Sequence, residues 1–302
     1  MFTGATISLE ALIGDRPEIT LVRDCDLSHV AKIPCLVARR VVPCARGSHL
    51  SAALREPDVV GVIVPEVLRE QVPEQLGLAV APNPTVAANS LHEALCAKEG
   101  FLWEHFDSVI DPTAIVHPTA YVAPYDVRIG PHTIVHPGAV ILERSIIGAH
   151  CAIGPGTVVS TDAFEVDTGT SPRRILKQAG GVWLDDYVEV QAKCTLVRST
   201  FGGFTRIGRE SKFDCQVHLA HDCQIEERVR IAACAEISGR VCVGADSFIG
   251  PNCSISNGVN IGAHAHVTLG AVVVRDVGEG ARVSGNFAVD HQRLIAHIKA
   301  IR

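Results

Sequence analysis

The sequence lacks a long apolar run. None of its hydrophobic stretches approaches the ~18–20 residues that cross a bilayer, so no transmembrane helix is expected. The N-terminus lacks a basic start followed by an apolar stretch, so no secretory signal is evident. Positive charge is also scarce, because 27 Lys and Arg stand against 33 Asp and Glu. The formal net charge of −6 argues against a general nucleic-acid binder.

CxxC pairs are also missing, although the chain contains 11 cysteines. Several of these cysteines occupy small-residue positions of a repeat, which is described next. We therefore expect reduced, structural thiols and a cytoplasmic protein rather than a disulfide framework. Apolar residues make up 47% of the 302 residues and charged residues 20%, which indicates a packed globular chain of one or two domains.

What the sequence does contain is a six-residue repeat. An aliphatic or aromatic residue falls at every sixth position over eleven successive steps. These positions are Ile207, Phe213, Leu219, Ile225, Ile231, Ile237, Val243, Ile249, Ile255, Ile261, Val267 and Val273. Neither a helical period of 3.6 nor a strand period of 2 gives this run. Hexapeptide spacing predicts a parallel β-helix in which three short strands make one coil of about 18 residues.

The same spacing occurs upstream, with interruptions. A first block runs from Ile110 to Val159, with one step of seven at Val122, and a short block runs from Leu184 to Leu196. Between them lies an excursion, residues 161–181, which is rich in charge, Gly and Pro. Gly often follows the repeated aliphatic residue directly, and a small residue often stands at the fourth place after it. Such residues suit tight corners and a narrow core.

The first 105 residues lack the repeat and are expected to form a separate α/β domain, ahead of a β-helix over residues 106–285. Within this domain we expect strands over Val59–Pro65 and Leu78–Ala81 and helices over Pro65–Leu76 and Thr85–Lys98. Residues 286–302 are expected to form a short helix with one apolar face. That helix would cap the last coil, because solenoid ends need covering, and it could also touch neighbouring subunits.

Four segments resemble, in order, those of the UDP-3-O-acylglucosamine N-acyltransferase family of lipid A (lipopolysaccharide) biosynthesis. Pro57–Leu95 is similar to its uridine-binding domain, Ser160–Gly181 to its excursion, Lys212–Asp222 (KFDCQVHLAHD) to its active-site coil, and Val283–Ala296 to its exit into the C-terminal helix. The resemblance implies a left-handed β-helix in a mostly β fold. It also implies a homotrimer whose sites lie between subunits, with no permanent cofactor.

The resemblance further implies an N-acyltransferase. The donor would be a phosphopantetheine thioester on acyl carrier protein or coenzyme A, and the acceptor would be a nucleotide-linked amino sugar. Three departures bear on the substrate. Leu50–Leu54 lacks the aromatic and amide groups of the family's uracil pocket, Val259 replaces its second active-site His, and Thr195–Arg198 has lost an acid.

Three residues are candidates for catalysis. His221 matches the family's catalytic His and would act as general base, a role in which imidazole suits neutral pH. Asp214 would orient the His or a substrate amine, although a solvated corner carboxylate is an equal alternative. Gly239 lies eighteen residues after His221, hence one coil along, and the resemblance places its N–H at the oxyanion. An ordinary corner Gly is the alternative for that position.

Other functions stay open on the sequence alone. A short-chain sugar N- or O-acyltransferase that uses acyl-CoA fits the departures near the uracil pocket. A non-catalytic β-helix serving as a binding or scaffold subunit is an alternative of another class. A zinc site built from His218, His264 and His266 would need three converging imidazoles, and scattered solvated histidines are the preferred interpretation. No metal is therefore expected.

Overall fold

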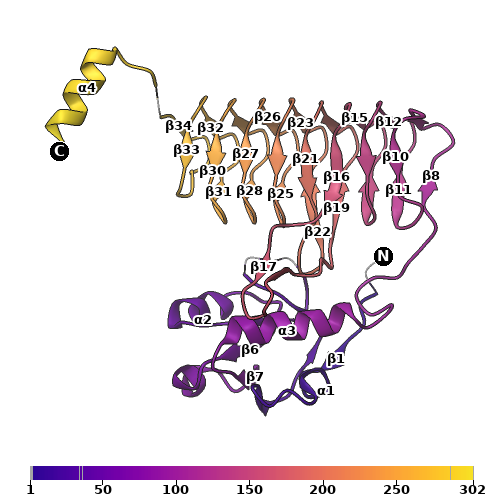
Figure 1. Cartoon of the computed structure of the whole chain (residues 1–302), viewed down its shortest axis with the longest axis vertical. Helices are drawn as coiled ribbons and strands as arrows, with labels where there is room; N and C mark the ends of the chain where they lie inside the picture. Colours follow the sequence, from indigo (N-terminus) through magenta and orange to yellow (C-terminus); the bar gives the residue numbers. More distant parts are fainter. Residues whose placement is uncertain (1–2, 34, 36, 286, 302) are drawn as a thin grey trace.

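The computed structural model describes residues 3–33, 35, 37–285 and 287–301. Residues 286 and 302, which fall in the predicted C-terminal segment, lie outside the described residues, as do residues 1 and 2. Figure 1 shows a long β-helix lying alongside an N-terminal α/β part, with helix α4 standing apart from both. None of the helices in the described part of the chain has the length and apolar character of a membrane span.

The β-helix consists of three parallel sheets, one for each side of the coil. It is the left-handed β-helix implied by the resemblance, and the predicted fold class is confirmed. The first sheet contains β8 (Val109–Ile110), β11 (Val127–Ile129), β14 (Ser145–Ile147), β19 (Gly181–Leu184), β22 (Phe204–Ile207), β25 (Gln224–Ile225), β28 (Cys242–Val243) and β31 (Asn260–Ile261).

The other two sheets follow the same register, in which each strand pairs with the strand of the next coil. The second contains β9 (Ile115–Val116), β12 (Ile134–Val135), β15 (Ala152–Ile153), β20 (Glu189–Val190), β23 (Lys212–Phe213), β26 (Arg230–Ile231), β29 (Phe248–Ile249), β32 (His266–Val267) and β34 (Arg282–Val283). The third contains β10 (Tyr121–Val122), β13 (Val140–Ile141), β16 (Val158–Thr161), β21 (Thr195–Val197), β24 (His218–Leu219), β27 (Glu236–Ile237), β30 (Ser254–Ile255) and β33 (Val272–Val273).

The repeat positions form the core of this solenoid. From Ile207 to Val273 each repeated side chain is buried and belongs to one apolar cluster. The residue before it points outward, as the period of a strand requires. Non-glycine residues with positive φ recur every six positions at the corners, among them Asp222 (φ 61°) and Arg240 (φ 60°). The corner conformation therefore fixes which side chains stand beside one another in successive coils.

The N-terminal part is built on a five-stranded sheet of order β2-β7-β6-β5-β4. Its strands are β2 (Thr20–Arg23), β4 (His29–Val30), β5 (Arg40–Pro43), β6 (Val59–Val64) and β7 (Gly77–Val80), and only β2 is antiparallel to its neighbour. A separate pair joins β1 (Ile7–Ser8) to β3 (Asp26–Leu27). The helices are α1 (Leu9–Ile13), α2 (Gly47–Ala53), η1 (Glu66–Gln71) and α3 (Pro84–Cys96).

Most of the elements expected here are present. The two expected strands are β6 and β7, and the expected helix over Thr85–Lys98 is α3, which begins where the Asn83 side chain accepts from the Val86 amide. The helix expected over Pro65–Leu76 is the shorter 3₁₀ helix η1. The division of the chain at residues 105 and 285 stays a prediction.

The excursion leaves the β-helix after β16 and forms the hairpin β17 (Val166–Asp167) and β18 (Arg174–Ile175). It packs on α3, where Asn89 donates to Asp167 (3.2 Å) and Glu93 accepts from the Lys177 amide (2.9 Å). A second loop, residues 199–203, reaches the same helix, because the ring of Phe201 meets His92 edge-on at 4.9 Å. These two loops place the N-terminal part beside the coil that contains His221.

The C-terminal helix α4 (His291–Ala300) forms as predicted, with Asp290 accepting at its N-terminus from Gln292 and Arg293 amides. The prediction that it caps the last coil is wrong for the single chain, because it has no buried residue and stands away from the β-helix (Figure 1). Its apolar face therefore has no partner among the described residues of this chain. All 11 cysteines are unpaired.

Candidate active site

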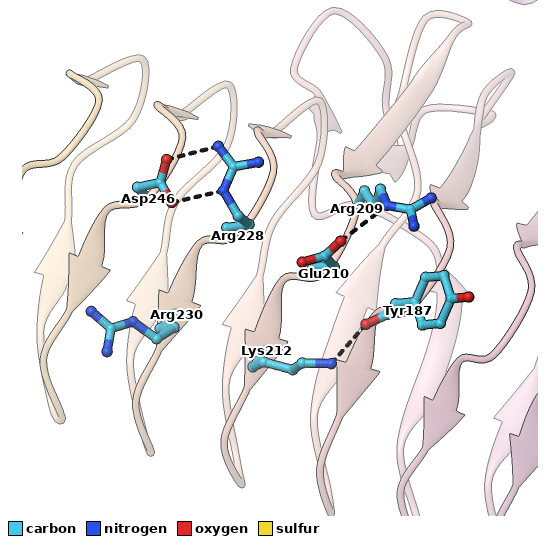
Figure 2. A pocket seen from close by; sticks show the side chains of 7 residues that line it. All are labelled: Tyr187, Arg209, Glu210, Lys212, Arg228, Arg230 and Asp246. Atoms are coloured by element: carbon cyan, nitrogen blue, oxygen red, sulfur yellow. Dashed lines mark hydrogen bonds and ion pairs between the residues drawn. The ribbon is translucent and has the colours of Figure 1, made fainter.

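An open cavity of about 650 Å³ lies on a corner of the β-helix and is lined by several cations (Figure 2). Most of these cations already have acidic partners. Arg228 forms two hydrogen bonds of 2.8 Å with Asp246, Arg209 pairs with Glu210 (3.1 Å), and Lys212 pairs with Glu189 (2.7 Å). Charges that are balanced in this way leave little positive charge to bind an anionic substrate.

A buried acid–imidazole pair stands at the corner after β24. His221 Nδ1 lies 2.8 Å from Asp222 Oδ2, and the two side chains are 13% and 5% exposed. An ionised carboxylate can only accept a hydrogen bond, so Nδ1 carries the proton. In the neutral ring the lone pair is then on Nε2, which can take a proton from another molecule.

Asp222 is held firmly in this position. Its backbone N–H donates to Thr205 Oγ1 (2.8 Å), and the Ser199 hydroxyl donates to its Oδ1. Its φ of 61° lies in the left-handed region that Asp tolerates better than most residues. The carboxylate therefore has a fixed orientation, and through it the imidazole ring is fixed as well.

Gly239 lies directly against the ring. A Cβ added to Gly239 would lie 2.6 Å from both Cε1 and Nε2 of His221 and 2.9 Å from Asn257 Nδ2. His221, Gly239 and Asn257 thus form a column with one residue per coil. Among the described residues no hydrogen bond engages the Gly239 N–H. The structure therefore brings together two of the predicted site residues, His221 and Gly239.

The pair opens into a cavity of about 440 Å³ between β16, β21, β24 and β27. Its lining residues are Thr161, Asp162, Phe164, Thr195, Val197, His218, Ala220, His221, Glu236, Ser238 and Gly239. Phe164, from the excursion, is 86% exposed. The lining thus combines the His221 ring, the carboxylates of Asp162 and Glu236 and the exposed ring of Phe164, a set of groups suited to a polar acceptor beside an apolar chain.

Asp214 lies at a different corner, the one after β23. It is exposed, and its Oδ1 accepts from the Cys215 amide (2.7 Å). Within this chain the carboxylate hydrogen-bonded to His221 is that of Asp222, and no contact joins Asp214 to His221 among the described residues, so an orienting role for Asp214 stays a prediction. A role for Asp214 toward a substrate amine stays a prediction. The sequence did carry a signal for Asp222, because an acid directly follows the candidate base.

Two departures from the family pattern gain a structural meaning. Val259 is 5% exposed and belongs to the solenoid core, so a side chain there points away from the cavity. Leu50–Leu54 falls largely in α2, where Leu50 and Ala53 are buried in the N-terminal core. Among the described residues no cluster of three or more His, Cys, Asp or Glu is arranged to hold a metal ion.

A further cavity, of about 230 Å³, lies at the carboxyl ends of β4 and β5. It is lined by Lys32, Ile33, Pro43, His49, Ala52 and Thr85. In open α/β sheets, ligands commonly bind at this edge of the parallel strands. The walls are mostly apolar. The one lysine in the lining, Lys32, is hydrogen-bonded to Glu165.

The chain has recognisable relatives. The profile of the bacterial transferase hexapeptide family (six repeats) matches residues 126–161. A UDP-3-O-acylglucosamine N-acyltransferase from Janthinobacterium sp. (strain Marseille) is 26% identical over 160 residues, which are 53% of this chain and 45% of that protein. The enzyme of the same name from Maricaulis maris (strain MCS10) is 36% identical over 112 residues, 37% of this chain and 30% of that protein.

These alignments cover less than half the length of the relatives. They confirm the resemblance predicted from the sequence: the chain is related to the UDP-3-O-acylglucosamine N-acyltransferases. Among solved structures, a UDP-N-acetylglucosamine acyltransferase from Campylobacter jejuni aligns with a TM-score of 0.48 and 20% identity, over 64% of this chain and 83% of that one. A likeness of that size carries no argument about substrate.

Proposed function

We propose that this relative of the UDP-3-O-acylglucosamine N-acyltransferases is itself an acyltransferase. It would move an acyl group from a phosphopantetheine thioester, on acyl carrier protein or coenzyme A, to the amine of a nucleotide-linked amino sugar. The observation that carries the proposal is the His221–Asp222 pair, whose free Nε2 lies against Gly239 in a cavity of about 440 Å³.

The chemistry needs only groups that this chain supplies. The amine nitrogen of the acceptor attacks the thioester carbon while His221 Nε2 takes the proton that the nitrogen loses. The C–N bond forms, the C–S bond breaks, and the thiolate leaves with the proton returned by the imidazolium. A positioned base of this kind contributes about 10²–10⁴-fold in rate. The unengaged Gly239 N–H is proposed as a donor to the oxygen that becomes negative during attack.

Each end of the acceptor has a suitable place. Asp162 and Glu236 line the catalytic cavity and suit an amino group or sugar hydroxyls. The mostly apolar cavity at the edge of the N-terminal sheet suits a nucleotide base. The exposed ring of Phe164 is available to an acyl or pantetheine chain. No permanent cofactor is needed for this reaction.

A second candidate is a short-chain sugar N- or O-acyltransferase that uses acyl-CoA. The observation that favours it is α2, which presents Leu50–Leu54 where the family has aromatic and amide groups for uracil. A changed nucleotide pocket beside a retained base indicates a changed acceptor.

Assembly and location are part of the proposal. Outward-facing apolar side chains occur on two sheets of the first coils, with Ile115 63%, Tyr121 49% and Ile134 38% exposed. Contact between β-helices around a threefold axis would cover such residues, and the apolar face of α4 would pack on a neighbouring subunit. A homotrimer in the cytoplasm is therefore proposed.

The deciding experiment is mass spectrometry of acceptor acylation by the purified full chain. One arm offers UDP-3-O-(3-hydroxyacyl)glucosamine with 3-hydroxyacyl carrier protein. The other offers a panel of amino-sugar nucleotides with acetyl-CoA. Each arm includes His221→Ala and the control His264→Ala, since His264 lies at a remote corner of the solenoid.

Product in the first arm that is lost in His221→Ala supports the main proposal. Product only in the second arm supports the short-chain transferase. Turnover that is unchanged in His221→Ala overturns the proposed base. The absence of product in both arms contradicts both enzyme proposals and favours a binding or scaffold subunit.

A further inference from the structure

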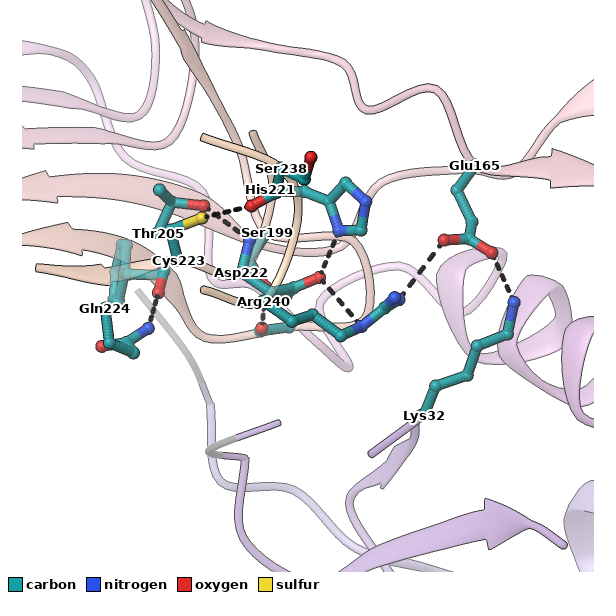
Figure 3. Close-up of polar contacts among 12 residues, drawn as sticks. Lys32, Glu165, Ser199, Thr205, His221, Asp222, Cys223, Gln224, Ser238 and Arg240 are labelled. Carbon is teal, nitrogen blue, oxygen red and sulfur yellow. Dashed lines mark hydrogen bonds and ion pairs between the residues drawn. The ribbon is translucent and has the colours of Figure 1, made fainter. Parts of the chain in front are cut away.

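A chain of alternating charges leads from the catalytic pair into the N-terminal part of the molecule (Figure 3). Arg240 Nε lies 4.0 Å from Asp222 Oδ2, and Arg240 Nη2 lies 3.3 Å from Glu165 Oε2. The other oxygen of Glu165 accepts a hydrogen bond from the Lys32 ammonium. The three residues come from a corner of the β-helix, the excursion and the segment after β4, respectively.

These side chains are shielded from water. The side chains of Arg240, Glu165 and Lys32 are 11%, 16% and 24% exposed. Charges in such surroundings attract one another more strongly than on an open surface, and removal of one leaves its neighbour poorly compensated. Burial disfavours the charged form of Glu165, but the Lys32 hydrogen bond and the nearby cations outweigh it and hold the pKa of Glu165 below its ordinary value.

Arg240 is placed by its backbone to act on the pair. Its N–H donates to the His221 carbonyl (2.8 Å), so it belongs to the coil that stacks directly on the catalytic corner. Its Nε is buried and has no hydrogen-bond partner among the described residues, so its action on Asp222 is electrostatic. Asp222 Oδ2 thus lies between two positive or protonated groups, the His221 ring and the Arg240 guanidinium.

We propose that Arg240, held by Glu165 and Lys32, is a positioning residue for the His221–Asp222 pair, so that the N-terminal domain sets the geometry and charge of the catalytic base. The inference deepens the proposed acyl transfer and rests on it. The Arg240 cation weakens the electrostatic attraction between the Asp222 carboxylate and the protonated ring of His221. The ion pair with Glu165 limits how closely Arg240 approaches Asp222. Lys32 also lines the cavity at the carboxyl ends of β4 and β5, so this residue belongs both to that cavity and to the chain of charges that reaches His221.

The test compares Arg240→Gln, Arg240→Lys, Glu165→Gln and Lys32→Met in the full chain, with Arg228→Gln as the matched control. Arg228 is also a corner arginine paired with a carboxylate, but its partner is Asp246 in the remote cavity. We expect Arg240→Gln to lower kcat at least tenfold with KM changed less than threefold. Arg240→Lys should restore most of the rate, and Arg228→Gln should change neither constant.

The pH profile separates positioning from a merely structural role. The charged or titratable groups facing His221 are Asp222, Arg240 and Glu165, together with the cavity residues Asp162, Glu236 and His218. Loss of the Arg240 cation leaves Asp222 freer to favour the protonated ring, so the acid limb of kcat/KM should move to higher pH. Loss of the Glu165 anion should move it to lower pH. Shifts in the same direction, or none, would overturn the proposal.

A double-mutant cycle tests whether the chain acts as one unit. Lys32→Met should lower kcat severalfold in the native background and have no further effect on kcat in Glu165→Gln, because Lys32 acts on the base only through Glu165; a contribution of Lys32 to acceptor binding would change KM instead. Additive losses would show that Lys32 acts independently and would contradict the chain.

A readout without turnover distinguishes failure of this inference from failure of the proposed function. Diethyl pyrocarbonate modification of His221, relative to His264 in the same molecule, is followed by peptide mass spectrometry across pH. If the native protein acylates nothing, the proposed function fails but this ratio still tests the chain. Opposite displacements of the His221 profile in Arg240→Gln and Glu165→Gln support it, and profiles that match the native protein refute it. If Arg240→Gln does not fold, a displacement of the His221 profile to lower pH in Glu165→Gln, with a near-native profile in Arg240→Lys, supports the proposal, and a native profile in Glu165→Gln refutes it.

Discussion

Gly239→Ala is expected to disable the proposed acyltransferase without weakening the fold. The added Cβ would lie 2.6 Å from Cε1 and Nε2 of His221, so the ring must retreat by about 0.8 Å to reach an ordinary contact of 3.4 Å. The φ of Gly239 is not in the left-handed region, so alanine brings no backbone strain. The main cost is displacement of the imidazole from the place set by Asp222, with a smaller shift of the Asn257 amide, which would lie 2.9 Å from the added Cβ.

The size of the effect follows from the displacement. A misplacement of about 1 Å in a reacting group can cost roughly 10²-fold in rate. We therefore expect kcat to fall about 100-fold in the acceptor-acylation assay. The melting temperature should stay within about 2 °C, a change of less than 1 kcal/mol for a chain of this size.

Alanine substitutions at two further glycines serve as controls for activity and stability. Gly278 has no atom within 4 Å of an added Cβ, so Gly278→Ala should leave both rate and melting temperature unchanged. A Cβ at Gly244 would lie 2.4 Å from the Ala263 backbone nitrogen, so Gly244→Ala should lower the melting temperature. Full activity in Gly239→Ala would refute the placement of the base. A loss of activity that merely follows a lower melting temperature would refute the reasoning from ring displacement.

Three further predictions follow from the same structure. Asp222→Asn should lower kcat by roughly 10²–10⁴-fold, because an amide no longer fixes the proton on Nδ1; a loss below tenfold would contradict this. Burial lowers the pKa of His29 to about 4 from 6.5, so its stabilising contribution is complete above pH 6.5 and is lost toward pH 4. Urea unfolding should show a loss of about 3 kcal/mol over that range, reduced in His29→Gln; an equal loss in the variant would contradict the assignment. Removal of residues 290–302 should weaken the proposed trimer in light scattering and leave the circular dichroism of the β-helix intact, whereas an unchanged dissociation concentration would argue against α4 as a subunit contact.

The β-helix could be predicted residue by residue because its period is local. Each repeated side chain, such as Leu219, enters the core for the same reason as the one six positions earlier. The column of His221 and Gly239 follows from the same arithmetic. The orientation of Val259, whose side chain points into the core and away from the cavity, does not follow from the resemblance. An alignment matches sequence positions and does not give the direction of a side chain.

The surroundings of the base could not be predicted, because they depend on loops that leave the repeat. Ser199 and Glu165 come from segments where the period fails, and Lys32 lies 133 residues before Glu165. The apolar face of α4 was visible in the sequence, but its partner was not, since no described part of the chain covers it. Local patterns thus predicted elements, whereas contacts between interrupted segments needed the folded chain.

The glycines that follow the repeated residues make their closest contacts in one direction along the solenoid. A Cβ at Gly130, Gly208 or Gly262 would meet the backbone of a later coil at 2.4 to 2.7 Å, and no earlier coil stands among its nearest atoms. Each such glycine therefore leaves room for a coil that has not yet been synthesised when the glycine emerges from the ribosome. A substitution at one of these glycines would therefore push against the following coil and not against the preceding one. The same asymmetry holds at the proposed catalytic corner, where the ring of His221 is packed against Gly239 of the following coil.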